Sequence, residues 1–369
     1  MRPTWAEVDL GAIRANTMAV RACVDPATVI AVVKADGYGH GALPIAVEAL
    51  GAGATGLAVA LVEEGLVLRA GGVRAPILVL AEVHADSVRD ALDADLELTV
   101  ASRAAIDAIA RVAPHARGER RAPRVHLKID TGMHRVGAAV ADALDLARHA
   151  TGAGLTLAAV WSHLATADEP EHPWTIEQLG RVERALEALR AAGLVWERTH
   201  VANSAGALFH VRARHDAVRA GISLYGIAPN PEHEPGVALR PALSLHSRVS
   251  ALRSIGPGEP VSYGARWSAG RAARIATVPI GYADGVPRRL GLVDGDVLVR
   301  GQRRPIRGVV TMDQLMIEVD EDVAMGDEVV LLGRQGRESI GAWDWARSLD
   351  TIAYEILTGI GSRVPRRYR

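Results

Sequence analysis

The amino-acid sequence predicts an α/β fold: a (β/α)8 barrel of the TIM type, followed by a smaller, mostly β, C-terminal domain. The length of 369 residues exceeds one typical domain and suits a large barrel with a second domain. Short apolar runs alternate with amphipathic stretches from about residue 28 to residue 224, and the alternation ends at the proline-rich segment Pro229–Pro235. We therefore place the barrel in residues 1–235 and the β domain in residues 236–369.

Eight short apolar runs are the predicted barrel strands. They are Val29–Val33, Thr55–Val59, Ile77–Leu80, Leu96–Val100, Val125–Asp130, Leu155–His163, Thr199–Asn203 and Ala217–Gly221. Stretches with apolar residues at helical spacing lie between them, among them Ser102–Val112, Ala138–Ala150 and Trp174–Ala192. Repeated strand–helix units favour a closed barrel, and a doubly wound open sheet is the structural alternative.

The C-terminal domain is predicted from shorter runs with a changed periodicity. These runs are Leu243–Ser250, Arg274–Pro279, Asp296–Val299, Leu315–Val319 and Glu328–Leu332. Turn pairs such as Pro257-Gly258 and Asp294-Gly295 separate them. The first ten residues precede the first helix and are candidates to pair with this domain as a strand.

Composition excludes some classes of function. The chain is 49% hydrophobic with a net charge of −1, which gives no electrostatic case for binding nucleic acid or an anionic membrane. The arginine-rich residues 363–369 read as a short solvated tail. A single cysteine, Cys23, excludes an intramolecular disulfide and fits a reducing compartment. With no signal-peptide core and no run of membrane-span length, we expect a soluble cytoplasmic protein.

Lys34 is the most informative single residue. It follows the apolar run Val29–Val33 and precedes a glycine-rich turn that carries Tyr38 and His40. A lysine at the mouth of a buried strand loses water around its ammonium, so its pKa falls and its neutral amine becomes a nucleophile toward carbonyls. A Schiff-base lysine of a pyridoxal phosphate (PLP) enzyme needs these properties. Taken alone, a lysine just past a strand is more often an ordinary surface lysine, and the rest of the chain favours the functional interpretation.

Other polar residues follow the predicted strands, at the end where a barrel carries its active site. They are Lys128 and Asp130 after the fifth strand, His163 after the sixth, Asn203 and Ser204 after the seventh, and Arg219, Gly221 and Ile222 at the eighth. The histidines are scattered and show no metal-ligand spacing, so we predict no metal site.

A series of motifs in both halves of the chain resembles the alanine racemase family of PLP enzymes. The motifs are AEVDLGAIRAN, AVVKADGYGHG, KIDTGMHRVG, WSHLATADE, HVANSAG, RAGISLYG, SYGARW, IGYADGVPR, TMDQLMIEV and TIAYEILTGIGSRVPR. Their number and order make the resemblance specific. It implies a barrel with a β domain, racemisation of L- and D-alanine to supply D-alanine for peptidoglycan, and a head-to-tail homodimer.

The resemblance implies two bases on opposite faces of the substrate Cα. Lys34 would hold PLP and act on one face, and Tyr263 would act on the other. Two opposed groups suit a reaction that removes a proton from one face and returns one to the other. A tyrosine is a poor base at its ordinary pKa of ~10, and a cationic network through His163 and Arg219 would lower that pKa. Without the resemblance, Tyr263 would read as a core or interface tyrosine.

The resemblance also assigns the cofactor contacts. Arg219 would face the pyridine nitrogen; since arginine keeps its proton, this nitrogen must accept and stay neutral, which disfavours side reactions. A salt-bridged arginine at a strand end is the alternative. The further cofactor-binding residues implied are Tyr38, His163, Asn203, Ser204, Gly221, Ile222 and Tyr354. Glycine and helix N-terminal amides suit a phosphate dianion.

The substrate contacts are implied in the same way. Arg135 and the backbone of Met312 would hold the substrate carboxylate. Lys128 stands where many relatives carry a carbamylated lysine that orients this arginine, and an ordinary buried lysine is the alternative. Tyr282 and Asp313 would line the entrance. The partner subunit would supply Tyr263, Met312 and Asp313.

Three other functions compete with alanine racemisation. One is a racemase of serine or another amino acid on the same fold. Another is a decarboxylase of related fold, which would need a carboxylate where Arg219 stands. The third is a non-catalytic PLP-carrier protein, which has no use for a β domain bearing Tyr263.

Overall fold

The computed structural model describes residues 2–115 and 122–369. The chain divides into two compact units. One, which we call the barrel unit, comprises Ile13–Gly37 and Ala42–Arg240. The other, which we call the β unit, comprises Met1–Ala12, Tyr38–Gly41 and Pro241–Arg369.

Eight parallel strands close the barrel, which confirms the predicted fold class and excludes the open sheet. They are β2 (Thr28–Val32), β3 (Gly56–Val59), β4 (Ile77–Glu82), β5 (Glu97–Val100), β6 (Arg124–Asp130), β8 (Thr156–Trp161), β9 (Arg198–His200) and β10 (Ala217–Ala220). The order β5-β4-β3-β2-β10-β9-β8-β6 returns to its start because β5 also pairs with β6. Each strand lies within or overlaps a predicted apolar run, and most strand residues are buried.

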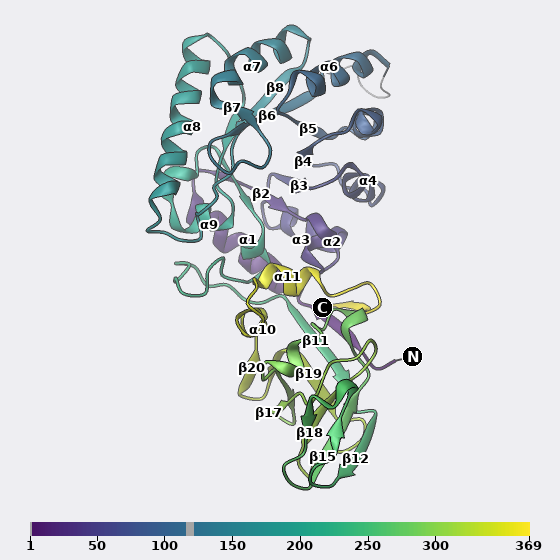
Figure 1. Ribbon diagram of the computed structural model, residues 1–369. Coiled ribbons are helices and arrows are strands. Elements are labelled where there is room, and N and C mark those ends of the chain that lie inside the picture. The colour runs from purple at the N-terminus through teal and green to yellow at the C-terminus, as the bar shows by residue number, and fades with distance from the viewer. Residues whose placement is uncertain (1, 116–121) are drawn as a thin grey trace. The chain divides into compact units, whose positions relative to one another are not determined.

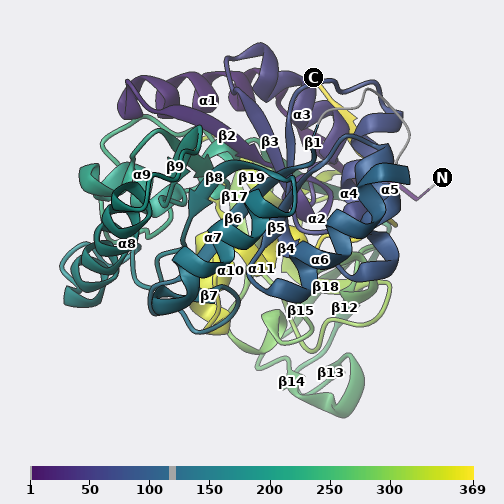
Figure 2. The ribbon, with the colours of Figure 1, turned by 90° about the horizontal axis from the view of Figure 1, so that it is seen from above.

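Helices surround this ring of strands, as the view along the barrel in Figure 2 shows. They are α1 (Leu10–Val24), α3 (Ala42–Gly51), α4 (Val62–Ala70), α5 (Val88–Asp93), α6 (Arg103–Val112), α7 (Ala143–Gly152), α8 (Pro173–Ala191) and α9 (Ser204–Phe209). The short segment α2 (Lys34–Tyr38) is a left-handed turn rather than an α-helix. Figure 1 labels most of these elements.

The start of the helix predicted over Ala138–Ala150 was wrong. Ala138 and Ala139 form the short strand β7, which pairs with the end of β6, and the helix α7 begins only at Ala143. Gly137, at a φ of 147°, lets the chain approach the backbone of Asp130 closely enough for this pairing. The alanine-rich segment carries no local signal for the two-residue strand.

The β unit contains two sheets and a hairpin. Its strands are β1 (Trp5–Val8), β11 (Leu243–Arg248), β12 (Ala251–Ile255), β13 (Pro260–Val261), β14 (Trp267–Ser268), β15 (Ala273–Val278), β16 (Asp296–Val299), β17 (Gln302–Pro305), β18 (Leu315–Val319), β19 (Glu328–Gln335), β20 (Glu338–Ile340) and β21 (Arg366–Tyr368). The larger sheet has the order β17-β16-β19-β11-β1-β21, and β12-β15-β18 form the smaller one. Two helices, α10 (Ala342–Leu349) and α11 (Ala353–Thr358), complete the unit.

Both ends of the chain are built into the larger sheet. The N-terminal strand β1 runs antiparallel to β11 and parallel to β21. The prediction of a solvated arginine-rich tail was therefore wrong. The Arg366 guanidinium donates hydrogen bonds to the carbonyls of Gly39, Gly361 and Val364. The pattern of apolar residues in the sequence does not indicate these bonds.

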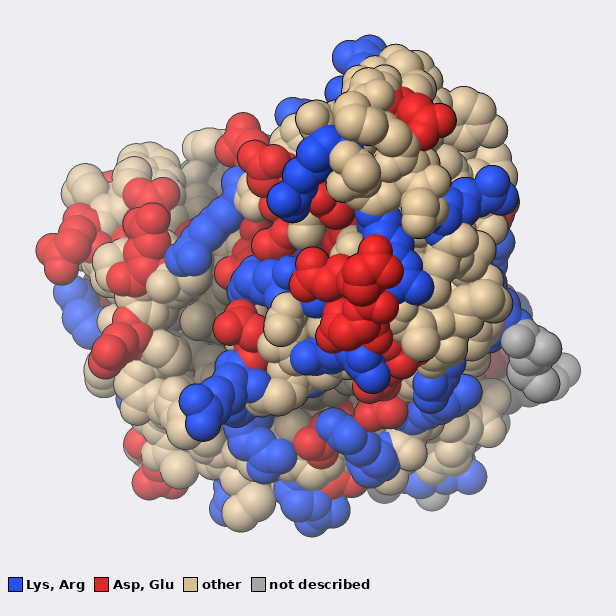
Figure 3. All heavy atoms as spheres, turned by 90° about the horizontal axis from the view of Figure 1, so that it is seen from below, with Lys and Arg blue, Asp and Glu red and all other residues tan. Residues whose placement is uncertain are grey.

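The surface in Figure 3 carries acidic and basic side chains side by side, without a broad area of one sign. Several of these charges are paired: in the β unit Arg304 binds Asp320, and Arg300 lies near Asp322 and Asp327. No helix in the described ranges is both long and apolar enough to cross a membrane.

Candidate active site

Lys34 stands two residues beyond β2, at the start of a left-handed turn. The φ angles of Ala35, Asp36 and Gly37 are 52°, 51° and 61°. Left-handed backbone costs a non-glycine residue about 1–2 kcal/mol, so other contacts must hold it. The amide of Gly37 donates to the carbonyl of Val33 (2.9 Å), and the Asp36 carboxylate accepts from the amide of Ala42 (2.8 Å). These bonds fix the backbone directly after Lys34.

Four cationic side chains meet at this end of the barrel: Lys34, Lys128, Arg135 and Arg219. Burial lowers the pKa of Lys34, Arg135 and Arg219 lower it further, and Glu64 opposes them. Burial, followed by Arg135 and Arg219, lowers the pKa of Lys128 to about 8. The pKa of Lys34 thus moves in the direction that the sequence predicts, toward a neutral and nucleophilic amine.

Arg219 is 3% exposed and is held by neutral acceptors. Its Nη1 donates to His200 Nδ1 and to the His200 carbonyl, both at 2.8 Å. Its Nη2 donates to the carbonyls of Ser162 (2.9 Å) and Val201 (3.0 Å) and to His163 Nδ1 (3.0 Å). Within the described residues no carboxylate binds this guanidinium, so the salt-bridged alternative is excluded. Burial lowers its pKa to about 9, and it remains charged at neutral pH.

A chain of hydrogen bonds leads from Arg219 through the barrel interior to Glu97. His200 Nε2 lies 2.9 Å from His126 Nδ1, and His126 Nε2 lies 2.8 Å from Glu97 Oε2. Since arginine only donates, His200 Nδ1 must accept, which places the proton of this neutral ring on Nε2. His126 Nδ1 then accepts in turn, and His126 donates to the carboxylate. All protons in the chain therefore point from Arg219 toward Glu97.

The charges along this chain are consistent with that direction. Burial lowers the pKa of both histidines, and the nearby charge of Arg219 lowers that of His200 further, so both rings are neutral. Burial alone would raise the pKa of Glu97, but the hydrogen bonds from His126 and Arg124 and the charge of Arg124 lower it to about 2. Arg124 pairs with Glu97 at 2.6 Å. The chain of hydrogen bonds therefore ends in an ionised carboxylate.

We expect Glu97→Gln to destabilise the folded chain by about 1–3 kcal/mol, because it removes a buried carboxylate that two partners bind. The pKa of Glu97 is lower in the folded chain, so its ionisation favours folding at neutral pH. That contribution is lost as the pH falls from about 4.5 toward about 2, and the difference between wild type and variant should shrink over this window. Urea unfolding of both proteins at pH 7 and at pH 3 measures this difference.

Glu197→Gln is the matched control for this prediction. Glu197 binds the other side of the Arg124 guanidinium but is half exposed, so its loss should cost at most about 1 kcal/mol. Equal destabilisation by the two variants would show that the buried hydrogen bonds beyond Glu97 add no stability to that of the Arg124 ion pairs.

Trp161 contacts two of the cationic groups. Its indole ring lies 4.5 Å from Lys128 Nζ and 4.5 Å from the guanidinium carbon of Arg219. Such contacts favour the charged form of each group. Sequence reasoning missed Trp161, Glu97 and His126. The available signal was a charged or polar residue inside an apolar strand, as in Glu97-Leu-Thr-Val and Val125-His-Leu.

The loop that carries Arg135 is organised by Asp130 at the end of β6. Its Oδ1 accepts from the amides of Gly132 (2.9 Å), Met133 (3.0 Å) and His134 (3.1 Å). Burial would raise the pKa of Asp130, and these backbone donors lower it. The predicted Asp130 thus shapes the loop, and the Arg135 side chain, which follows it, is exposed.

A cluster of hydroxyl and amide groups joins the ends of β9 and β10. The buried Ser204 hydroxyl accepts from the amide of Gly221 (2.8 Å) and contacts the amide (3.3 Å) and hydroxyl (3.0 Å) of Ser223. Asn203 caps α9 by accepting from the amide of Gly206 (2.8 Å). The structure therefore brings Ser204, Gly221 and Ile222 together and gives Asn203 a capping bond. Ser223, which was not among the predicted residues, is an additional member of this cluster.

The remaining predicted residues lie in the β unit. Tyr38 and Tyr354 are neighbours, with ring centroids 6.0 Å apart, and burial raises the pKa of Tyr38. Tyr282 and Met312 lie on two paired loops, because the amide of Tyr282 donates to Thr311 (2.9 Å) and the carbonyl of Met312 accepts from Ala283 (3.0 Å).

Gly281 makes the approach of these two loops possible. A Cβ at this position would collide with the carbonyls of Thr311 and Met312. Asp313, at the tip of the second loop, is bound by Arg363 (2.6 Å). Met312 is 53% exposed, so its backbone and side chain lie at the surface of the unit.

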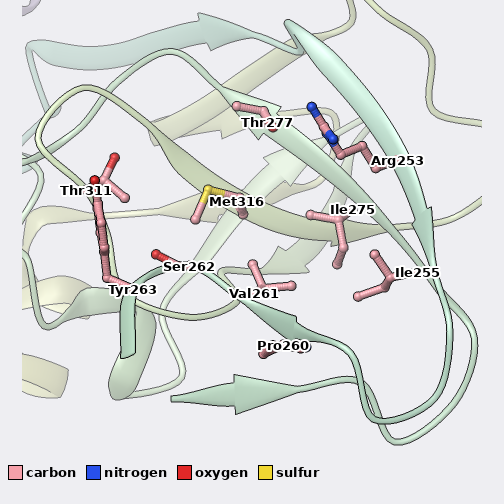
Figure 4. Close-up of a pocket in the computed structure, with 10 residues that line it drawn as sticks. All are labelled: Arg253, Ile255, Pro260, Val261, Ser262, Tyr263, Ile275, Thr277, Thr311 and Met316. Carbon is pink, nitrogen blue, oxygen red and sulfur yellow. The ribbon is translucent and has the colours of Figure 1, made fainter. Parts of the chain in front are cut away.

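Tyr263 lies at the tip of the β13–β14 hairpin and is 74% exposed. Ser262 enters the tip at a φ of 69°, and its hydroxyl donates to the carbonyl of Val309 (2.6 Å). A cavity of about 380 Å³ lies beside it (Figure 4). Tyr263 and Thr311 flank one side of the cavity. Apolar side chains such as Ile275 line the rest together with Arg253 and Thr277.

Two family matches together cover most of the chain. The family described as alanine racemase, N-terminal domain, matches residues 8–229, and alanine racemase, C-terminal domain, matches residues 242–368. The alanine racemase of Symbiobacterium thermophilum is 48% identical over 100% of this chain and 97% of its own length. That of Thermobifida fusca is 44% identical over 98% of this chain and 97% of its own.

Solved structures agree with these matches. The alanine racemase of Bacillus anthracis with bound L-Ala-P superposes with a TM-score of 0.94 at 39% identity, covering 100% of this chain and 95% of its own. The alanine racemase of Streptomyces lavendulae gives 0.94 at 38% identity, covering 100% and 97%. Family, sequence and structure therefore agree in both units. The chain belongs to the alanine racemase family of isomerases.

Proposed function

We propose that this chain interconverts L- and D-alanine with pyridoxal phosphate as cofactor. The observation that carries the proposal is the group of Lys34, Lys128, Arg135 and Arg219, whose charges act on one another at the C-terminal ends of the barrel strands. It occurs in a chain that is 48% identical to an alanine racemase over its full length.

The donor set of the barrel unit fits PLP. Lys34 offers an amine of lowered pKa to the aldehyde. Ser204, Ser223 and the amides around Gly221 offer hydroxyl and N–H donors to the phosphate. Arg219, whose partners among the described residues are all neutral, is a donor suited to the pyridine nitrogen. That Asn203, Tyr38 and Tyr354 also contact the cofactor stays a prediction from the family resemblance.

Two side chains move the protons. Bound PLP supplies an electron sink for the negative charge left when the substrate Cα loses its proton. Lys34 Nζ takes or returns a proton at one face of Cα, and Tyr263 Oη does so at the other. His163, kept neutral by burial and the charge of Arg219, accepts from that guanidinium and holds it in place. Arg219 donates and gives up no proton to the cofactor.

Arg135 and the backbone of Met312 bind the substrate carboxylate in this proposal, and Tyr282 and Asp313 border the entrance. With a pKa of about 8, Lys128 is in part a neutral amine at physiological pH, the form that reacts with carbon dioxide. Its carbamylation would place a negative charge near Arg135.

We further propose a head-to-tail homodimer in which the partner subunit supplies Tyr263, Met312 and Asp313. The high exposure of Tyr263 and Met312 supports it, because a base that acts in a buried site needs a surface to cover it. A role in supplying D-alanine for peptidoglycan and a location in the cytoplasm stay predictions.

Chiral analysis in D2O tests the proposed function. PLP-loaded protein is incubated with L-alanine, and we expect D-alanine that carries deuterium at Cα. D-Alanine without deuterium would contradict proton exchange. If no D-alanine forms although the cofactor is bound, alanine is not the substrate, and the same assay with serine, lysine and arginine separates a racemase of other specificity from a PLP-carrier protein.

A further inference from the structure

The carboxylate of Glu64 joins the loops that follow two neighbouring barrel strands. Its Oε1 accepts from the amide of Ala35 (2.6 Å), the residue directly after Lys34. Its Oε2 accepts from the amides of Ala60 (2.7 Å) and Leu61 (3.2 Å), which follow β3. One carboxylate therefore satisfies three backbone donors.

The local sequence explains why a glutamate is needed at this position. Leu61 precedes α4 as its N-cap residue and has no side-chain acceptor, so Glu64, in the first turn, reaches back to cap the helix. Only one of its oxygens is used for this cap. The other is free to bind Ala35, whose left-handed backbone needs an acceptor for an amide that the strand no longer pairs.

Glu64 also differs in charge from the other groups that face Lys34. Arg135, Arg219 and Lys128 are cationic, and His163 is neutral. Together the cations favour the neutral amine of Lys34, and Glu64 favours its ammonium form. The carboxylate that holds the turn is thus also the negative charge beside the lysine.

We propose that Glu64 is a positioning residue for Lys34, which fixes the left-handed turn behind the lysine and balances the positive charge around its amine. The inference deepens the proposed function, since it concerns the lysine placed in the reaction. The backbone and the amine of Lys34 can be studied without substrate, so the test does not require turnover.

The test uses the fact that Lys34 and Lys128 are the two lysines of the whole chain. The full-length protein, freed of cofactor with hydroxylamine, is labelled with trace acetic anhydride between pH 6 and pH 11. Mass spectrometry of the two lysine peptides then gives the pKa of each amine. The pKa of Lys128 is followed in the same samples for comparison.

Glu64→Gln removes the charge and turns one accepting oxygen into an NH2 group, which cannot accept from a backbone amide. We expect the pKa of Lys34 to fall by about 1 unit, since an adjacent opposite charge favours the ammonium form by that order. We expect a smaller change at Lys128. Glu63→Gln is the matched control, because Glu63 carries the same charge on the same helical turn but is exposed, and it should leave Lys34 unchanged.

Glu64→Asp separates charge from geometry. It keeps the negative charge but is too short to span both loops, so the pKa of Lys34 should lie nearer to the wild-type value than in Glu64→Gln. This variant also serves if Glu64→Gln does not fold. In the PLP-loaded enzymes, racemisation should fall about tenfold or more in Glu64→Gln and stay at the wild-type level in Glu63→Gln.

An unchanged Lys34 pKa in both Glu64 variants, or an equal shift in Glu63→Gln, would overturn the proposal. Failure of the proposed function has a different signature. In that case the wild-type protein would not racemise alanine, while the labelling experiment would still report whether Glu64 controls Lys34.

Discussion

Replacing Lys34 with alanine is expected to reduce racemisation of alanine by about 10⁴-fold or more. The substitution removes the amine that we propose to hold the cofactor and to move a proton at one face of Cα, and a single acid–base group alone contributes about 10²–10⁴-fold. The turn after Lys34 keeps its backbone bonds, so the fold should persist. Chiral analysis of alanine measures the loss of racemisation. The visible absorbance of the PLP-loaded protein measures the loss of covalent cofactor attachment.

Lys128→Ala is the control for covalent attachment. Because the chain contains two lysines, borohydride reduction followed by mass spectrometry places the cofactor on one of two peptides. We expect the added mass on the Lys34 peptide in wild type and in Lys128→Ala, and on neither peptide in Lys34→Ala. Retained turnover in Lys34→Ala, or cofactor on Lys128 of the wild-type protein, would remove Lys34 from the mechanism.

The barrel was predictable because its signal is local. Most of the buried strands coincide with short runs rich in apolar residues, and parallel strands buried on both faces read as near-continuous apolar runs. The same rule places Lys34, Lys128 and Arg219 at strand ends, and strand ends of a barrel converge at one face. The strand pattern alone therefore assigns three residues that are distant in the sequence to one site.

Features that depend on contacts between distant segments were not predictable in this way. Nothing near Glu97 in the sequence indicates that its partner is His126, and nothing near Arg366 indicates that it binds the carbonyl of Gly39. The left-handed turn after Lys34 is likewise held by Glu64, whose bond to Ala35 spans 29 residues of the chain. Such bonds depend on the folded arrangement, while apolar periodicity reports only which face of a segment is buried.

Tyr263 illustrates a different limit. Its motif Ser262-Tyr-Gly-Ala-Arg-Trp267 supports a role only through resemblance, since an exposed tyrosine at a hairpin tip has no chemistry of its own to distinguish it. A function that depends on a second subunit cannot be read from one chain's pattern of buried residues. The assignment therefore requires an experiment that distinguishes the two faces of the substrate.

Tyr263→Phe is expected to retain the cofactor and to slow racemisation by about 10²–10⁴-fold, the usual contribution of one acid–base group. The remaining base, Lys34, should still exchange the Cα proton of one enantiomer with solvent. Exchange from the other enantiomer, whose proton faces the missing hydroxyl, should be slowed far more. Proton NMR of pure L-alanine and pure D-alanine in D2O follows the two exchange rates separately.

Tyr282→Phe provides the matched comparison, because it removes the same hydroxyl from another tyrosine of the β unit. We place Tyr282 at the entrance, so its loss should slow exchange from both enantiomers to the same extent, through access rather than proton transfer. If two bases act, Tyr263→Phe should slow exchange from one enantiomer much more than from the other, and Tyr282→Phe should not. Equal slowing of both enantiomers in Tyr263→Phe would instead indicate that one group serves both faces, and Lys34 would then be the sole base.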